Sequence, residues 1–390
     1  MRSIDLKVLK LAHAGILPSR SRTAIHIQVL ILLAMMVFLS TEASAQGMMA
    51  GMPTKEEAEA VKISEDQKRA VIDKLKESIL EGYILRDKAK GVADQIGEKF
   101  SSGAYKETGD AYSFCRALTM DLRAITNDPH FNVLYHPLLF QRLEQMATAA
   151  SADAAGPGGS QRGPAPQPPP STDSKKNFFF RKLEVLEGNV GYLKLELIPQ
   201  INEAKPTLDS AMGFLGNTDA MIIDLRDNPG GFGGFISYFM SYFFPAEKML
   251  LFRRDLSIGD PQVFYVENDL PNKRLDKVPV YILINQRTGS AATNFTYTMQ
   301  KHGRATVVGQ TTGAGRLGAH SAGPFTLADG FVSTIPIGRV VHPKTNSNWN
   351  TTGVVPDLPT EGDAKEEAHK AALEKLGVKK ASETGKPDSR

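Results

Sequence analysis

Ser290 stands at a point in the chain where a hydroxyl group would be useful for chemistry. The apolar run 279–284 predicts a buried strand, and residues 291–302 predict a helix that is closed by Gly303. A short polar loop between them ends at Ser290, so the hydroxyl lies at a helix start beside free backbone N–H groups. This position suits a nucleophile next to an oxyanion site. It equally suits a helix-capping serine, and the segment alone leaves both interpretations open.

A second segment with chemical potential is the glycine-rich turn that ends in Gly230 and Gly231. The nearly continuous apolar run 220–225 predicts a buried strand that leads directly into this turn. Glycine lets backbone N–H groups approach a substrate closely, so the turn is a candidate for one oxyanion donor. The alternative is an ordinary strand-exit turn.

Histidine is the side chain best suited to accept a proton near neutral pH, and His130 is the leading candidate. It stands in the triplet Asp128-Pro129-His130, directly after a predicted helix at 110–125. His320 and His342 lie in or near glycine-rich segments and are weaker candidates. His302 ends the predicted helix after Ser290, where it would interact with the helix dipole.

Other kinds of chemistry find little support in the sequence. Residues 309–315 are rich in glycine but lack the Lys-Ser/Thr ending of a phosphate-binding loop. No HExxH spacing or cysteine cluster indicates a metal site, and we predict no metal and no cofactor. Cys115 is the single cysteine, so no internal disulfide can form, and we expect a buried structural thiol.

Five segments occur in an order and at a spacing that resemble the C-terminal-processing (tail-specific) protease family. The similarity is greatest to its tricorn-like and interphotoreceptor-retinoid-binding-protein-like branch. The resemblance covers about residues 177–359. The segments are GNVGYLKL from Gly188, MIIDLRDNPGG from Met221, TGSAATNF from Thr288, GRATVVGQTTGAG from Gly303 and NWNTTGVVPD from Asn348.

The resemblance implies an α/β (α+β) core with a mixed, ClpP/crotonase-like sheet, preceded by a small helical N-terminal domain. It also implies a serine-type endopeptidase that acts on unfolded or C-terminal polypeptide segments by acyl transfer. Ser290 matches the nucleophile of the family and His130 the base of the tricorn-like branch. The backbone N–H groups of Ala291 and of Gly231 (or Gly230) match the oxyanion hole.

The chain also departs from the family pattern. The lysine base of the processing branch is absent, and Lys301 is too far along the predicted helix to replace it. Two glutamates of the tricorn-like branch are replaced, by Thr293 and by Asn350. We expect Asn350 to orient the histidine by a hydrogen bond, but it cannot supply a negative charge; exchanging a triad acid for its amide costs about 10⁴ in turnover. The alternative function is therefore a weak or inactive member that binds a hydrophobic ligand or peptide.

The predicted elements that position these residues divide the chain into five parts. Residues 1–45 read as a signal peptide, 46–148 as a helical N-terminal domain, 149–174 as a linker rich in proline and glycine, and 175–362 as the protease-like core. Residues 363–390 predict a charged helix and a tail. No PDZ-like domain is evident between the helices and the core.

The charge and the leader bear on location and partners. The leader carries five basic and two acidic residues, which accounts for the formal net charge of +3. Its apolar run 29–39 is shorter than the roughly 20 residues that span a bilayer, and Ala43-Ser44-Ala45 fits a cleavage site before Gln46. We predict an exported protein, periplasmic or extracellular, without a stable membrane span after cleavage. The nearly neutral remainder gives no electrostatic reason to propose nucleic acid or an anionic membrane as a partner. The resemblance implies a polypeptide substrate. The oligomeric state is not indicated.

Overall fold

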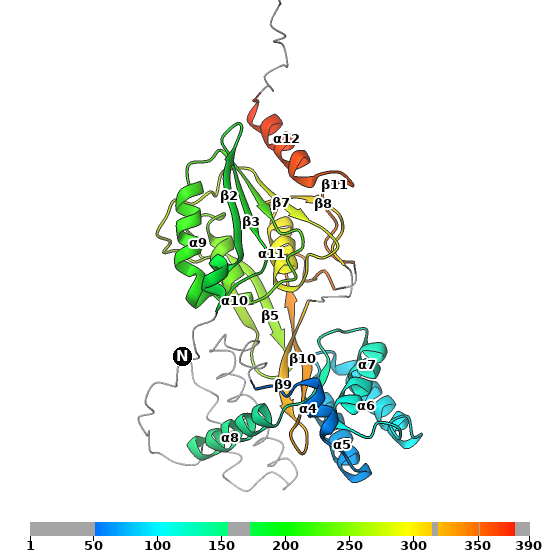
Figure 1. Ribbon diagram of the computed structural model, residues 1–390. Coiled ribbons are helices and arrows are strands. Elements are labelled where there is room, and N and C mark those ends of the chain that lie inside the picture. The colour runs from blue at the N-terminus through cyan, green and yellow to red at the C-terminus, as the bar shows by residue number, and fades with distance from the viewer. Residues whose placement is uncertain (1–50, 155–171, 314–318, 351, 379–390) are drawn as a thin grey trace, which may run out of the picture.

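The computed structural model describes residues 51–154, 172–313, 319–350 and 352–378. Figure 1 shows their arrangement. The helices are α4 (Lys55–Ala60), α5 (Glu65–Gly82), α6 (Arg86–Ser101), α7 (Ala111–Thr126), α8 (Pro137–Ala154), the 3-10 helix η1 (Thr172–Phe179), α9 (Ile201–Leu215), α10 (Gly233–Ser241), α11 (Ser290–Lys301) and α12 (Ala364–Leu376). The strands are β1 (Asn132–Tyr135), β2 (Phe180–Leu186), β3 (Val190–Leu195), β4 (Ala220–Asp224), β5 (Leu250–Leu256), β6 (Gln262–Tyr265), β7 (Val280–Ile284), β8 (Thr306–Gly309), β9 (His320–Thr326), β10 (Phe331–Val341) and β11 (Leu358–Pro359).

A six-stranded mixed sheet forms the centre of the C-terminal part. Its order is β11-β8-β7-β4-β3-β2, and all neighbours are parallel except the antiparallel pair of β2 and β3. Every residue of β4 and β7 is buried, as expected for central strands covered on both faces. The predicted α/β fold class with a mixed sheet and preceding helices is confirmed.

Helices cover both faces of this sheet. Alternate side chains of β3, β4 and β7 point to opposite faces. One set, which includes Leu193, Ile223 and Ile282, packs with residues of α9, α10 and α11 in the largest core. The other set, which includes Tyr192 and Ile222, packs beneath α12. In Figure 1, α9 lies beside the sheet and α12 lies at its far end, next to β11. The sheet therefore fixes the strand ends that carry the candidate site.

A second, five-stranded sheet was not predicted. Its order is β1-β10-β5-β6, with β9 also paired to β10, and its pairs are antiparallel. The long strand β10 contains Pro336 and Gly338, and the β9–β10 register shifts between these two residues. Proline and glycine lower the strand signal of a sequence and mark such irregularities. They explain why the pattern of this segment did not predict a strand.

The helical N-terminal part packs against the second sheet. Thr54 and Ser64 form capping boxes at α4 and α5, and Asp110 caps α7. The buried faces of α5, α6 and α7 share a core with residues of β1 and β10, including Phe131 and Ile335. Figure 1 shows β9 and β10 reaching from the C-terminal part down to these helices. The second sheet is therefore the connection between the two parts.

The predicted linker differs from the structure at both ends. Helix α8 continues to Ala154, because residues 147–154 are mostly alanine, the best helix former. Helix η1 already begins at Thr172. Residues 155–171 of the linker, the predicted leader 1–45 and the tail after residue 378 lie outside the described residues. No helix in the described part of the chain is long and apolar enough to cross a membrane.

Candidate active site

Ser290 is the first residue of α11, and its backbone conformation is unusual. The N-cap of the helix is Gly289, in an extended conformation, and no side-chain hydrogen bond caps the helix. The interpretation of Ser290 as a capping serine is therefore wrong. Its φ angle of 44° lies in the left-handed region, which residues other than glycine rarely adopt. Strained backbone of this kind gathers at functional sites, and a strained strand-to-helix turn presents the nucleophile in enzymes of the α/β-hydrolase fold.

The glycine-rich turn lies directly against Ser290. A side-chain carbon at Gly230 would lie 2.5 Å from Cβ of Ser290 and 2.9 Å from the backbone nitrogen of Ala291. At Gly231, such a carbon would lie 2.0 Å from the carbonyl oxygen of Ile198. Both glycines have positive φ angles, 108° and 137°. Only glycine fits this close approach of two backbones.

The hydrogen bonds around this turn separate the two candidate glycine donors. The N–H of Gly230 donates to Oδ1 of Asn228 at 2.9 Å, so it is already satisfied. Within the described residues, no hydrogen bond uses the N–H of Gly231 or of Ala291. These two groups are the predicted oxyanion donors. Gly231, rather than Gly230, therefore has the N–H that is free to bind an oxyanion.

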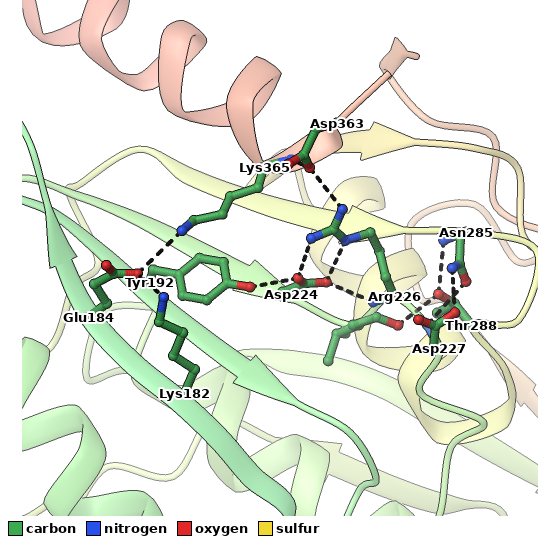
Figure 2. Close-up of polar contacts among 11 residues, drawn as sticks. Lys182, Glu184, Tyr192, Asp224, Arg226, Asp227, Asn285, Thr288, Asp363 and Lys365 are labelled. Atoms are coloured by element: carbon green, nitrogen blue, oxygen red, sulfur yellow. Dashed lines mark hydrogen bonds and ion pairs between the residues drawn. The ribbon is translucent and has the colours of Figure 1, made fainter. Parts of the chain in front are cut away.

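Hydrogen bonds hold the glycine turn and the nucleophile loop, residues 285–289, together. The N–H of Gly289 donates to the carbonyl oxygen of Asn228, and the hydroxyl of Thr288 donates to that of Leu225. Asp227 accepts from the side-chain amide of Asn285 at 2.7 Å, and its N–H donates back to that side chain. Figure 2 shows Asp227 beside Asn285 and Thr288. The two loops therefore form one unit.

A buried charge anchors the start of the glycine turn. Asp224 at the end of β4 is fully buried, and its carboxylate accepts two hydrogen bonds from the guanidinium of Arg226 and one from the hydroxyl of Tyr192. Arg226 also donates to Asp363, the N-cap of α12. Figure 2 shows this chain of contacts between the sheet and α12. It fixes the direction in which the chain leaves β4 towards the glycines.

His130 is oriented by Asp128. Helix α7 ends at Asn127, whose φ of 52° turns the chain sharply into the Asp-Pro-His triplet. Oδ1 of Asp128 accepts from the backbone N–H of His130 at 2.9 Å and lies 2.8 Å from its Nδ1. Because an ionised carboxylate can only accept, Nδ1 carries the proton and Nε2 carries the lone pair. His130 is thus held in the tautomer that a general base requires.

Asp128 is a buried carboxylate that stays charged. Burial alone would raise its pKa, but the hydrogen bonds from His130 and from His320 outweigh burial and hold the pKa well below its usual range. Asp128 therefore supplies a negative charge beside His130. The loss of the glutamates at Thr293 and Asn350 had put that charge in doubt.

The structure gives Asn350 a different contact from the one we expected. Its Oδ1 accepts from the backbone N–H of Ala319 at 3.3 Å, and its own N–H donates to Oδ1 of Asn348. No hydrogen bond joins Asn350 to His130 in the described part of the chain. Thr293, at the other replaced position, donates to the carbonyl oxygen of Thr288 and so supports the nucleophile loop. The side chain that orients His130 is Asp128.

His320, which the sequence made only a weaker candidate for the base, is a partner of Asp128 in the structure. Its Nδ1 lies 2.5 Å from Oδ2 of Asp128, and its side chain is only 5% exposed. His320 and Asp128 are 192 residues apart, so no local spacing could have paired them.

The candidate site residues form two groups. Ser290, Gly231 and Ala291 form one group, and Asp128, His130 and His320 form the other. No hydrogen bond joins Ser290 to His130 among the described residues. In unliganded enzymes, such contacts are often long and tighten only with substrate.

A short series of contacts connects the two groups. A side-chain carbon at Gly233, just after the glycine turn, would lie 2.9 Å from Nη2 of Arg254 on β5. Arg254 is paired with Val340 on β10. The N–H of Val340 donates to the carbonyl oxygen of Ala319, the residue before His320.

Other candidate chemistry is not found around this site. Cys115 is buried in α7, and burial raises the pKa of its thiol far above the usual range, so it is an inert structural residue. Within the described residues, no group of three or more His, Cys, Asp or Glu side chains could hold a metal ion.

The sequence profile of peptidase family S41 matches residues 189–360. The profile for the N-terminal domain of family S41 in eukaryotic IRBP matches residues 56–156. The chain belongs to peptidase family S41. It is therefore a member of a family of serine-type peptidases, and the predicted resemblance to C-terminal-processing proteases is confirmed.

Individual relatives of this S41 chain are distant. It is 28% identical over 177 residues to carboxyl-terminal-processing peptidase 2, chloroplastic, from Arabidopsis thaliana, a match that covers 44% of this chain and only 32% of that protein. A solved structure from Parabacteroides merdae, described as a candidate peptidase, is 18% identical with a TM-score of 0.50 and covers 80% of this chain and 96% of that one. At this identity, the likeness shows the fold alone.

Proposed function

We propose that this protein is a serine endopeptidase that cleaves unfolded or C-terminal polypeptide segments by acyl transfer. The single observation that carries the proposal is the contact of the glycine turn with Ser290. In this arrangement, the N–H groups of Gly231 and Ala291 make no hydrogen bond within the described residues. An oxyanion hole requires such N–H donors beside the serine.

The chemistry follows from these positions. Oγ of Ser290 attacks the scissile carbonyl carbon, and its proton passes to Nε2 of His130. Asp128 stabilises the resulting imidazolium through the hydrogen bond to Nδ1. The N–H groups of Gly231 and Ala291 bind the oxyanion. The C–N bond then breaks, His130 returns the proton to the leaving amine, and water releases the acyl group with His130 again as base.

Digestion of unfolded casein by the purified protein tests this proposal, beside the variants Ser290→Ala and His130→Ala. We expect both variants to lose activity by about 10³-fold or more, as when a member of a catalytic triad is removed. Labelling with a fluorophosphonate, which reacts with activated serines, is expected to modify Ser290 and to need His130.

Equal cleavage by all three proteins would contradict the proposal. Absence of cleavage and labelling in the folded wild-type protein would instead favour the alternative of a family member that binds a hydrophobic ligand or peptide without cleaving it.

A further inference from the structure

One buried carboxylate serves two imidazole rings in this site. Oδ1 of Asp128 receives Nδ1 of His130, and Oδ2 receives Nδ1 of His320. The side chains of Asp128 and His320 are 6% and 5% exposed, whereas that of His130 is 19% exposed. The more exposed ring is the one that a substrate can reach, and the more buried ring lies behind the carboxylate.

The carboxylate of Asp128 determines which nitrogen of each imidazole ring carries a proton. Because ionised Asp128 can only accept, both Nδ1 atoms donate, and both rings keep a lone pair on Nε2. Either ring can therefore take up one more proton. The single carboxylate of Asp128 is therefore the shared acceptor for the Nδ1–H groups of both rings.

We propose that His320 is a positioning residue of this peptidase site. Its Nδ1–H holds Oδ2 of Asp128 so that Oδ1 faces His130. This inference rests on the proposed function, because it assigns His320 a role in the same proton transfer.

The backbone around His320 is held independently of Asp128. His320 begins β9, and its partner across the strand pair is Arg339 of β10. The preceding residue, Ala319, accepts from the N–H of Val340 and donates to Oδ1 of Asn350. The ring is thus delivered to Asp128 by β9 and β10. A change confined to the ring should leave the strand in place.

The test compares His320→Asn with His320→Leu. Asparagine keeps an N–H donor close to the position of Nδ1 but cannot gain a proton, whereas leucine removes both functions. His369→Asn is the matched control, because His369 is a half-buried histidine on α12 whose Nε2 lies 2.8 Å from the carbonyl oxygen of Glu187 and which has no place in the proposed reaction. Both kcat and KM for an unfolded casein-derived fluorogenic peptide are measured from pH 5 to pH 9.

We expect His320→Leu to lower kcat by about 10-fold to 100-fold with little change in KM, as for outer partners that orient a functional histidine. His320→Asn should recover most of that loss. The His369→Asn control should match the wild type.

Proton NMR provides a readout that does not depend on turnover. The wild type should show two strongly downfield ring N–H signals, and His320→Asn should lose one of them. Unchanged kcat, KM and pH profiles in both His320 variants would overturn the proposal. It would also be overturned if His320→Asn were inactive while His130→Ala retained activity, because His320 would then be the base. Activity that persists in Ser290→Ala would instead refute the proposed function, and the NMR signals would still report on the shared carboxylate.

Discussion

The candidate site depends on the fact that Gly230 has no side chain. Its backbone lies against Ser290 and Ala291, and its own N–H and carbonyl groups bind Asn228 and Ile198. Gly230 therefore lets the glycine turn lie directly against Ser290.

We expect Gly230→Ala to reduce kcat by about 10²-fold or more, in the range found when an oxyanion donor is lost. The added carbon would collide with Cβ of Ser290 at 2.5 Å. Gly303→Ala is the control, because Gly303 also has a positive φ, 72°, but no atom lies within 4 Å of the added carbon. Gly230→Ala should also lose more free energy of unfolding in urea than Gly303→Ala, because only Gly230→Ala adds a collision to the strain of a positive φ. Equal kcat values in the two variants would contradict this role for Gly230.

At the scale of single residues, much of the candidate site could be predicted, because its signals lie in short stretches of sequence. Ser290, Ala291 and Gly231 lie at strand ends, where apolar runs give way to glycine and polar residues. The triplet ending in His130 also contained its partner, Asp128, two residues earlier. The sequence did not show that Asp128 orients the ring, or that His320 shares it, because such contacts depend on how β9 and β10 meet the end of α7.

At the scale of elements, a buried ion pair near the site links β4 to α12. Asp224 is fully buried and receives Arg226, which also reaches the N-cap of α12. A buried ion pair that loses one partner leaves an uncompensated charge.

We expect Arg226→Ala to lower the free energy of unfolding by about 3–5 kcal/mol, measured by urea denaturation at pH 7. The matched control is Arg181→Ala. Arg181 is exposed and lies 3.7 Å from Glu196, so its loss should cost less than about 1 kcal/mol. A similar small loss in both variants would mean that Asp224 is not kept charged by Arg226.

The central strands were predictable, and the second sheet was not. β4 and β7 are continuous apolar runs because both of their faces are buried. β10 is nearly as buried, but Pro336 and Gly338 interrupt its pattern, and its partners β1, β5 and β9 are far apart in the sequence. Hydrophobic periodicity describes single segments and cannot indicate such pairings.

At the scale of the whole molecule, β10 belongs to both large cores. Ile335 and Ile337 pack with the N-terminal helices, and Val340 packs with the C-terminal core. Directly after the strand, His342 is buried with its ring 4.4 Å from that of His302. Neither ring nitrogen of His342 has a hydrogen-bond partner among the described residues.

This buried ring should make stability depend on pH. Burial, followed by the neighbouring His302, Lys344 and Lys301, lowers the pKa of His342 to about 4 from 6.5. The unfolded chain therefore binds the proton first as the pH falls. Stability is complete above about pH 7 and decreases between about pH 6.5 and pH 4. The expected loss is about 2 kcal/mol at pH 5 relative to pH 8, from the linkage relation.

Urea denaturation at pH 8 and pH 5 measures this loss, with His342→Phe as the comparison. Phenylalanine keeps an aromatic ring beside Tyr297 and cannot titrate. The variant should therefore show a smaller difference in unfolding free energy between the two pH values. The same difference in both proteins would assign the acid sensitivity to other groups.

The pairing of β1 with β10 also has a consequence for inheritance. The proposed base lies in the first third of this sequence and the proposed nucleophile in the last third, and β10, which packs with both parts, sets how the two parts lie relative to one another. A recombination event between them would separate the two halves of the reaction unless it also preserved the mutual fit of β1, β9 and β10. Natural exchange of the helical part between relatives is therefore constrained by a strand outside it.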